Sequence, residues 1–539
     1  MCALAAMLAA AAPAPAAPYG INAHVPDAAR LDRAAQAGIG WIRCDFNWTM
    51  LEPAQDQFAW AIFDQLVALA NARGLQIYAT IAYTPSWANG GQGGNVPPSN
   101  PADWYAAVFQ IVSRYKGSVH HWGMWNEPNL GDFWSGTRTQ YIQDILVNGA
   151  AAVKAADPTA LVAGPDLAHL NSGKWDQWLR DVLLQAGGSL DIVTHHQYSD
   201  DAYGTLDALD GPLNVASVKK IIDANGGGSK PFWLTETGWT SNEVGEPDQA
   251  DFYLELLDGM NARPWWQRIF FYELMDDPNI TSKWGVLRSD LSAKESYAAY
   301  ADLVALRPNG GRQALPGGGA TWEAESQLNH QVGHADGSAW TATPALDPQG
   351  YLAFGPYTTA LPGGLVLEAR FRLRSSVAGG AATVARVEVY DASRSNVLVQ
   401  HDVLASEFPS ASSWIDVAVQ FTPLTTHEIE LRTYFSDVAE VSLDRVTVVE
   451  TGLRPGPPAA GGCGTIGTIG GTAAPSADLT PWVGLAVLAL ARGRSIRSRR
   501  IATLERGGLR SLAAARSRLK DAGRAGQPGP RRATLRSAA

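Results

Sequence analysis

Two glutamates lie in short stretches whose composition suits acid and base chemistry. Glu127 lies in the stretch Trp-Asn-Glu-Pro-Asn, and Glu236 lies in Leu-Thr-Glu-Thr-Gly-Trp. Cleavage of a glycosidic bond requires one carboxyl group that protonates the leaving oxygen and a second that attacks or assists at the anomeric carbon. Glu127 and Glu236 are therefore candidates for such a pair, provided that the fold brings them together.

The elements that must position this pair alternate regularly along the chain. From residue 19 to about residue 306, short β-type runs alternate with amphipathic helical stretches, one of which begins at Asn100-Pro101 and ends before Gly117. The expected strands are 19–24, 40–46, 76–82, 119–125, 161–165, 192–196, 231–235 and 268–274. Eight strand-helix units predict an α/β fold of the (β/α)8 TIM-barrel type, for which roughly 250 residues is typical.

A doubly wound open sheet would also alternate strands and helices, but it usually has a Gly-rich phosphate turn after its first strand. Here the first strand leads into Val25-Pro26-Asp27, which favours the barrel. In a barrel, catalytic groups follow the carboxyl ends of the strands. Glu127 follows the fourth expected strand and Glu236 the seventh, so both face the same end.

Trp-Asn-Glu-Pro after strand four and Thr-Glu-Thr-Gly-Trp after strand seven resemble the clan A glycoside hydrolases, which are retaining (β/α)8 enzymes. Within this clan the chain is most similar to families 39 and 5, over roughly residues 19–305. The resemblance implies that Glu127 is the acid/base and Glu236 the nucleophile. It also implies that Asn126 holds the 2-hydroxyl of the sugar.

Three further residues fall where this clan has supporting groups. Arg43, at the end of the second expected strand, would lie beside the nucleophile and keep it ionised; a salt bridge at the barrel rim is the alternative. His196 and Tyr198 match the His-x-Tyr pattern of the clan, which implies that the Tyr hydroxyl points at Glu236. An apolar surrounding would raise the pKa of Glu127, while Arg43 would stabilise the anionic form of Glu236.

Aromatic residues in the loops after the strands are candidate platforms for sugar rings. Many clan members have a Trp at the end of strand eight, whereas this chain has Tyr272 there, so either Tyr272 or Trp284 takes that place. The other candidate platforms, each with packing in the core as the alternative, are Trp48, Trp87, Trp134 and Trp239. Glu273, Asp276 and Asp277 compete as the second carboxylate, but their surroundings match no supporting pattern.

Charge is distributed unevenly along the 539 residues. Residues 492–539 hold 14 Arg and Lys and 2 acidic residues, and since the whole chain has 42 basic and 52 acidic residues, the remainder has 28 and 50. A segment with this excess of acidic residues should repel nucleic acid and anionic membrane surfaces, which favours a neutral polymer or small molecule as partner; the motifs of the barrel imply a carbohydrate. No His, Cys and Asp pattern in the barrel has metal-ligand spacing, so we expect no cofactor there. We also expect the protein to be a monomer.

A Gly- and Pro-rich linker is expected at 307–319, and period-two strands predict an all-β, jelly-roll-like sandwich at 320–450. This segment resembles the carbohydrate-binding modules of families 6 and 35. The resemblance implies a structural calcium ion at Glu323, Glu325 and Asp444; a purely structural sandwich is the alternative.

Both ends of the chain suggest export. Residues 1–16 are expected to be a signal peptide, although they lack a basic start. Residues 451–539 contain a low-complexity stretch, a short apolar run and an Arg-rich tail. This order resembles the C-terminal sorting tails of Gram-negative surface proteins, which implies a transient contact with the membrane or the sorting machinery; a disordered basic tail is the alternative. We therefore expect a secreted or cell-surface protein.

The sequence thus predicts a barrel catalytic domain at 17–306 that hydrolyses β-glycosidic bonds by a two-step retaining mechanism. A surface carbohydrate-binding protein with an inactive barrel is the competing hypothesis. The intact set of Glu127, Glu236, Asn126, Arg43 and Tyr198 favours the enzyme.

Overall fold

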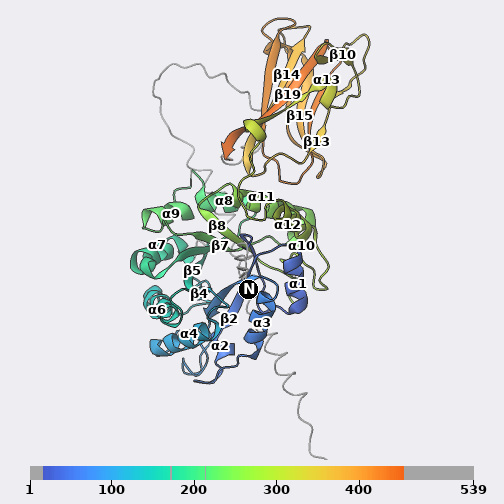
Figure 1. Ribbon diagram of the computed structural model, residues 1–539. Helices are drawn as coiled ribbons and strands as arrows, with labels where there is room; N and C mark the ends of the chain where they lie inside the picture. Colours follow the sequence, from blue (N-terminus) through green and yellow to red (C-terminus); the bar gives the residue numbers. More distant parts are fainter. Residues whose placement is uncertain (1–15, 170–172, 213, 454–539) are drawn as a thin grey trace, which may run out of the picture. The chain divides into compact units, whose positions relative to one another are not determined.

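The computed structural model describes residues 16–169, 173–212 and 214–453. Along the chain, an α/β barrel comes first and an antiparallel β-sandwich second (Figure 1). Cys2, Cys463, nearly all of the expected signal peptide and the C-terminal tail lie outside the described residues. Among the helices of the described part, none is both long and apolar enough to cross a membrane.

Eight parallel strands close into a barrel, since β1 pairs with both β2 and β8. The strands are β1 (Tyr19–Asn22), β2 (Trp41–Asn47), β3 (Gln76–Ala82), β4 (His121–Met124), β5 (Leu161–Ala168), β6 (Ile192–His196), β7 (Phe232–Thr237) and β8 (Trp266–Phe271). Each overlaps an expected strand, and the helices surround them (Figure 1). The TIM-barrel prediction is therefore confirmed.

The helices follow the signals in the sequence. In α4 (Pro101–Tyr115), the Asn100 side chain accepts a hydrogen bond from the backbone N–H of Ala102, and Pro101 occupies the first turn. The other long helices are α1 (Ala28–Gln36), α3 (Ala61–Asn71), α6 (Asn148–Ala156), α7 (Trp175–Ala186), α8 (Ala202–Asp210), α9 (Val218–Ala224), α11 (Glu246–Asn261) and α12 (Glu295–Leu306). Shorter pieces are α2 (Trp48–Leu51), α5 (Arg138–Gln140), α10 (Ser241–Val244) and a π-helix at Tyr141–Val147.

Two strands extend two or three residues further than the sequence predicts, and both carry site residues. β5 continues past Pro165 because its pairing with β6 shifts register between Gly164 and Leu167, which accommodates a residue without an N–H. β7 continues to Thr237, with an irregularity opposite His195 and His196 of β6. Such bulges re-aim side chains next to active sites.

Aromatic side chains fill the interior of the barrel. One buried cluster contains Trp41, Tyr78, Trp233 and Phe270, from β2, β3, β7 and β8. A Cβ atom at Gly123 of β4 would lie 2.5 Å from the Tyr78 hydroxyl oxygen, so only glycine leaves room for that ring. Tyr78 in turn donates to the carboxylate of Asp166, which links this packed interior to the site.

The sandwich consists of a six-stranded and a five-stranded sheet. The first has the order β10-β11-β19-β14-β17, with β9 paired to β19, and the second has the order β12-β18-β15-β16, with β13 paired to β18. The strands are β9 (Gly319–Glu323), β10 (His334–Asp336), β11 (Ala339–Ala342), β12 (Gly350–Ala353), β13 (Pro356–Thr358), β14 (Leu365–Ser375), β15 (Thr383–Asp391), β16 (Asn396–Leu404), β17 (Trp414–Phe421), β18 (Ile429–Phe435) and β19 (Val441–Leu453). A short helix, α13 (Ala324–Gln327), is added to the expected strands. Alternate residues of the long strands face a common apolar core.

Candidate active site

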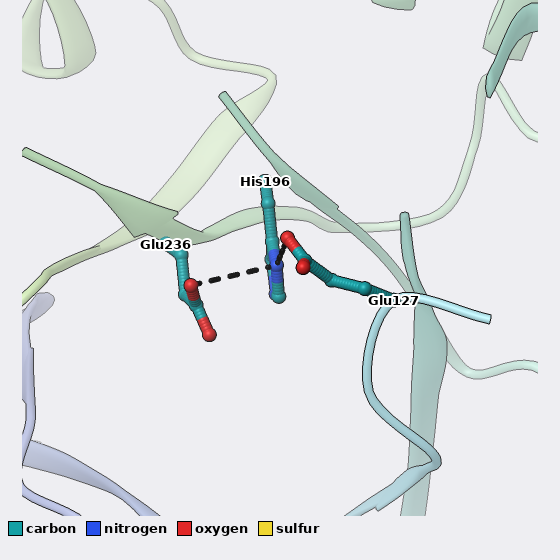
Figure 2. A group of neighbouring side chains, drawn as sticks. All are labelled: Glu127, His196 and Glu236. Carbon is teal, nitrogen blue, oxygen red and sulfur yellow. Dashed lines mark hydrogen bonds and ion pairs between the residues drawn. The ribbon is translucent and has the colours of Figure 1, made fainter. Parts of the chain in front are cut away.

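The two candidate glutamates meet at one end of the barrel. Glu127 lies in the loop after β4, whereas Glu236 lies within β7 rather than after it. Both side chains are nearly buried, with 8% and 9% of each residue exposed. Figure 2 shows the two carboxylates on either side of His196; one ligand atom from each of the three residues lies within 4.8 Å of the others.

His196 of β6 contacts three carboxylates. Its Nδ1 lies 2.9 Å from Oε1 of Glu127 and 3.7 Å from Oε2 of Glu236, and its Nε2 lies 3.6 Å from Oδ1 of Asp166. Burial disfavours the charged ring, but the charge of Glu236, the nearby carboxylate of Asp166 and the hydrogen bond with Glu127 outweigh it and raise the pKa of His196 to about 9. The ring is therefore an imidazolium at neutral pH.

Arg43 and Tyr198 hold Glu236. The Arg43 Nη1 donates to Oε1 of Glu236 at 2.5 Å, and the Tyr198 hydroxyl donates to Oε2 at 2.9 Å. Both donors act on the ionised carboxylate, which they stabilise as an anion. Arg43 lies inside β2, not at its end as the sequence suggested, and its fork reaches the site from within the barrel. The alternative, a salt bridge at the barrel rim, is excluded because the Arg43 side chain is only 4% exposed.

Arg43 also orients Asn126. Its Nη2 donates to Oδ1 of Asn126 at 2.7 Å, and its Nη1 donates to Oδ1 of Asn22 at 3.0 Å. Because a guanidinium only donates, it fixes the oxygen of the Asn126 amide toward itself. The NH2 group of that amide is then the part that can donate to a sugar hydroxyl.

The backbone around Glu127 adopts unusual conformations. Trp125 and Glu127 have φ angles of 83° and 45°, which cost residues other than Gly about 1–3 kcal/mol and persist only where the surroundings fix them. Here the N–H of Trp125 donates to the carbonyl of Ile81, and the N–H of Glu127 donates to the carbonyl of Asp166. The Trp125 indole donates to the carbonyl of Phe133 at 2.9 Å.

The surroundings of Glu127 favour its protonated form. Burial is the largest effect and raises the pKa of Glu127, and it prevails over the opposing hydrogen bond and charge of His196. Trp125, which precedes it in the same motif, is fully buried. A protonated Glu127 beside an Arg-bound Glu236 is the division of roles that a general acid and a nucleophile require.

Asp166 is a buried carboxylate that the sequence analysis missed. It lies in β5, is 1% exposed and accepts hydrogen bonds from the hydroxyls of Tyr78 and Thr235. Burial alone would raise the pKa of Asp166, but the charge of Arg43 and the interaction with His196 lower it well below its usual range. The available signal was an acidic residue directly after an apolar strand, at the barrel end that carries the chemistry.

The predicted aromatic platforms separate into two groups. The Trp284 ring packs edge-on against Tyr198 and Tyr272, at centroid distances of 5.5 and 6.1 Å, so both candidates for the strand-eight position lie beside the site. Trp87 instead packs against Trp48 and donates to the carbonyl of Glu52. The Trp239 ring packs on Phe252, and Trp48 and Trp134 are nearly fully buried. The platform interpretation is wrong for Trp48 and Trp134, because their rings are buried. For Trp87 and Trp239 the packing contacts favour the alternative.

A second charged group joins three strands near Tyr272. His24, after β1, lies 2.8 Å from Oδ2 of Asp45 in β2 and 3.2 Å from Oε2 of Glu273 after β8. Burial opposes the charge on His24, yet Asp45 and Glu273 raise its pKa well above the usual range. Glu273 is thus engaged in an ion pair and does not take the place of Glu236.

Glu127, His196 and Glu236 also have the composition of a metal-binding group, and they are the one such trio found within the described residues. Arg43 already compensates the charge of Glu236 at hydrogen-bond distance. A cation would have to displace the guanidinium or share the carboxylate with it against charge repulsion. The arrangement therefore fits acid and base chemistry better.

The predicted calcium ligands of the sandwich do not form such a trio in the part of the chain that the structure describes. Asp444 in β19 accepts from Nη1 of Arg445 and lies 3.5 Å from Nε of Arg372. Glu323 in β9 is in register with Arg445 rather than with Asp444, and Glu325 lies in α13. The calcium site stays a prediction.

Residues 93–253 match the family model described as Glycosyl hydrolases family 39. The matched segment lies within the barrel. It includes Glu127, Asp166, His196 and Glu236.

Two curated relatives are similar over parts of the chain. A β-xylosidase of Caldicellulosiruptor saccharolyticus is 28% identical over 241 residues, which is 40% of this chain and 47% of that protein. A β-xylosidase of Geobacillus stearothermophilus is 32% identical over 120 residues, 20% of this chain and 23% of that protein. The chain thus spans less than half the length of either relative.

Among solved structures, a family 39 glycoside hydrolase from the gut symbiont Bacteroides cellulosilyticus WH2 is similar, with a TM-score of 0.48 and 18% identity. The match covers 79% of this chain and 80% of that one.

Proposed function

We propose that the barrel hydrolyses β-glycosidic bonds in oligo- or polysaccharides by two steps with retention of the anomeric configuration. The observation that carries this proposal is the approach of the two carboxylates, whose oxygens lie within 4.8 Å of one another. Carboxyl groups about 5–5.5 Å apart are typical of retaining glycosidases, and inverting enzymes need about 6.5–9.5 Å to admit a water molecule.

In the first step, Glu236 attacks the anomeric carbon. The bond from that carbon to the leaving oxygen breaks, and the oxygen takes the proton of Glu127. A glycosyl ester on Glu236 results. In the second step, Glu127 as a carboxylate takes a proton from water while the water oxygen attacks the anomeric carbon. The ester bond breaks, and both glutamates return to their starting states.

The surrounding residues support this division of labour. Arg43 and Tyr198 donate to Glu236 and leave its carboxylate in place for attack. Asn126, held by Arg43, offers its amide NH2 to a sugar hydroxyl. The rings of Tyr272 and Trp284 lie at the edge of the site, where an apolar face can pack on a sugar ring.

We take β-xylosides as the first substrates to test, because two similar proteins are named β-xylosidases. A panel of aryl β-glycosides, together with xylan, β-glucan and mannan, covers the alternatives. Release of aryl alcohol from one sugar type, and of short or single sugars from one polymer, identifies the glycone and distinguishes exo from endo action.

The roles of the glutamates are tested by two variants. Glu236→Gly should abolish turnover, and added azide should restore it as a glycosyl azide, since azide occupies the space of the lost carboxylate. Glu127→Ala should slow substrates with poor leaving groups far more than activated ones, because only poor leaving groups need the proton. Retention of wild-type activity in both variants on every cleaved substrate would show the assignment to be wrong.

A carbohydrate-binding protein with an inactive barrel is the competing function, and it needs a defect in the site. Each group that the mechanism uses is present at contact distance. Binding of oligosaccharide without product after long incubation would favour that function.

For the whole protein we propose a secreted or cell-surface monomer whose sandwich binds carbohydrate. The likeness of the sandwich to carbohydrate-binding modules and the export-type composition of both chain ends support this proposal. Cell fractionation with an antibody against the barrel tests the location. Affinity electrophoresis of the full chain in xylan and mannan gels tests binding, with Glu236→Gly used to prevent digestion.

A further inference from the structure

Asp166 of β5 is contacted by side chains from four other strands of the barrel. The Tyr78 hydroxyl of β3 donates to its Oδ2 at 2.6 Å, and the Thr235 hydroxyl of β7 donates to its Oδ1 at 2.5 Å. Arg43 Nη2 of β2 lies 3.5 Å from Oδ2, and His196 Nε2 of β6 lies 3.6 Å from Oδ1. Each carboxylate oxygen thus has one hydroxyl bond and one cationic neighbour.

This pattern assigns different roles to the two kinds of neighbour. The hydroxyl bonds are short and fix the plane of the carboxylate. The cationic contacts are longer than ordinary hydrogen bonds, so Asp166 acts on Arg43 and His196 mainly through its charge. Tyr78 cannot replace that charge, because burial and the nearby Asp166 raise its pKa well above the usual range and keep it a neutral donor.

The charges of the site balance only when Asp166 is counted. Arg43 and the imidazolium of His196 contribute two positive charges, and Asp166 and ionised Glu236 contribute two negative ones. The site is then neutral with Glu127 protonated, which is the state that the first step requires. Without the charge of Asp166, the same five groups would carry a net positive charge in a nearly buried space, and His196 is the group most easily discharged.

The protonation of His196 decides where the proton of Glu127 lies. An imidazolium donates from both nitrogens, so Oε1 of Glu127, 2.9 Å from Nδ1, must accept, and the acid proton is confined to the other oxygen. A neutral ring can accept at Nδ1. It would then draw the proton of Glu127 toward itself and away from the glycosidic oxygen.

Resting on the proposed function, we propose that Asp166 is a positioning residue. It keeps both ring nitrogens of His196 protonated and thereby directs the acid proton of Glu127 to the leaving group. The residue touches neither substrate nor reacting atoms; it acts through His196 and Arg43. The titratable groups that face Asp166 or His196 are Arg43, Tyr78, Glu127, Tyr141, His195 and Glu236.

The decisive variant is Asp166→Asn in the full-length chain, which keeps the size of the side chain and removes its charge. Asp258→Asn is the matched control, since Asp258 in α11 is also fully buried and bonded to an Arg and a Thr, namely Arg307 and Thr425. Titration of His196 is followed by NMR in histidine-labelled protein, and a His196→Gln variant assigns its signals among the 10 histidines.

We expect the wild-type His196 signal to titrate near pH 9 and that of Asp166→Asn to titrate lower by about 1–3 pH units, the effect of losing one nearby opposite charge. Asp258→Asn should titrate like the wild type. An unchanged His196 titration in folded Asp166→Asn overturns the proposal. If Asp166→Asn does not fold, Tyr78→Phe, which removes one bond that fixes Asp166, should shift the titration in the same direction by a smaller amount, and no shift overturns the proposal.

Kinetics give a second readout. Asp166→Asn should reduce kcat/KM about 10- to 100-fold for aryl glycosides with poor leaving groups and less than about 5-fold for a dinitrophenyl glycoside, because only the former need the directed proton. Equal losses on both substrates overturn the proposal. Absence of any hydrolysis by the wild type counts against the proposed function alone, since the NMR titration requires no turnover.

Discussion

Replacing Arg43 by Lys tests how far the site depends on the geometry of one guanidinium. The side chain is 4% exposed and donates to Asn22, Asn126 and Glu236, while Asp166 lies 3.5 Å away. Lys keeps the charge but carries its three donors on a single nitrogen atom. It therefore cannot reach both Glu236 and Asn126, which the two terminal nitrogens of Arg43 bind separately. We therefore expect it to retain the ion pair with Glu236 and to lose the bond to Asn126.

The size of the effect follows from the bonds that are lost. A hydrogen bond to a charged group contributes about 1.5–3 kcal/mol. Loss of the one bond to Asn126, which acts in the transition state, therefore costs about 1.5–3 kcal/mol, or about 10- to 160-fold in kcat/KM. Arg43→Met would be worse, because it removes the cation bonded to Glu236 and leaves His196 to balance both Glu236 and Asp166, at a cost in stability of about 3–5 kcal/mol.

The assay is kcat/KM on the best aryl β-glycoside, together with thermal unfolding by circular dichroism. Arg114→Lys is the control, because Arg114 makes a two-bond pair with Asp64 on the surface, with both side chains 40% exposed. Exposed pairs contribute about 0–1 kcal/mol, so this variant should match the wild type in both measurements. A folded Arg43→Lys protein within about threefold of wild-type kcat/KM would refute the reasoning.

Further outcomes are expected from pH, metal removal and aromatic replacement. Because burial raises the pKa of Glu127, its acid form persists above the usual carboxyl range and is lost as pH rises through that pKa. The profile of kcat/KM against pH should therefore fall on its alkaline side. In Glu127→Gln, which has no titrating carboxyl group, that fall should disappear. Treatment with EDTA should leave hydrolysis of a small aryl glycoside unchanged, since Arg43 already compensates Glu236, and a loss restored by a divalent ion would contradict the acid-base assignment. Calcium should raise the melting temperature of the full chain and not that of Asp444→Asn; no shift in either protein removes the calcium site. Trp284→Ala should raise KM with little change in melting temperature, because its ring lies beside the site. Trp87→Ala should lower the melting temperature and leave KM unchanged, because its indole bonds to the backbone of Glu52. The reverse pattern would show that Trp87, and not Trp284, binds the sugar.

The sequence predicts the barrel and the approach of the two glutamates well because both depend on local patterns. Strands in a parallel barrel are buried on both sides and appear as short apolar runs, and helix caps such as Asn100 mark the intervals between them. Once eight units are counted, Glu127 and Glu236 must lie at the same end of the barrel. Arg43, Asn126 and Tyr198 follow from the resemblance of their motifs to a known clan.

Asp166 and the buried positions of Trp48 and Trp134 could not be predicted in the same way. Strand five was expected to end at Pro165, and the bulge that lets β5 continue is a pairing feature between strands, not a property of one segment. The hydroxyl of Tyr78 reaches Asp166 across the barrel interior from a residue 88 positions away. Whether a loop Trp faces solvent or core depends likewise on packing between elements, which a single sequence does not record.

Trapping of the glycosyl-enzyme tests the central claim most directly. The enzyme is incubated with a 2-deoxy-2-fluoro aryl glycoside of the sugar that it cleaves, and the protein is then digested and mapped by mass spectrometry. The proposed mechanism predicts one added glycosyl group on the peptide that contains Glu236, and none in Glu236→Gly. An adduct on another carboxylate, or turnover to a product of inverted configuration without any adduct, would contradict it.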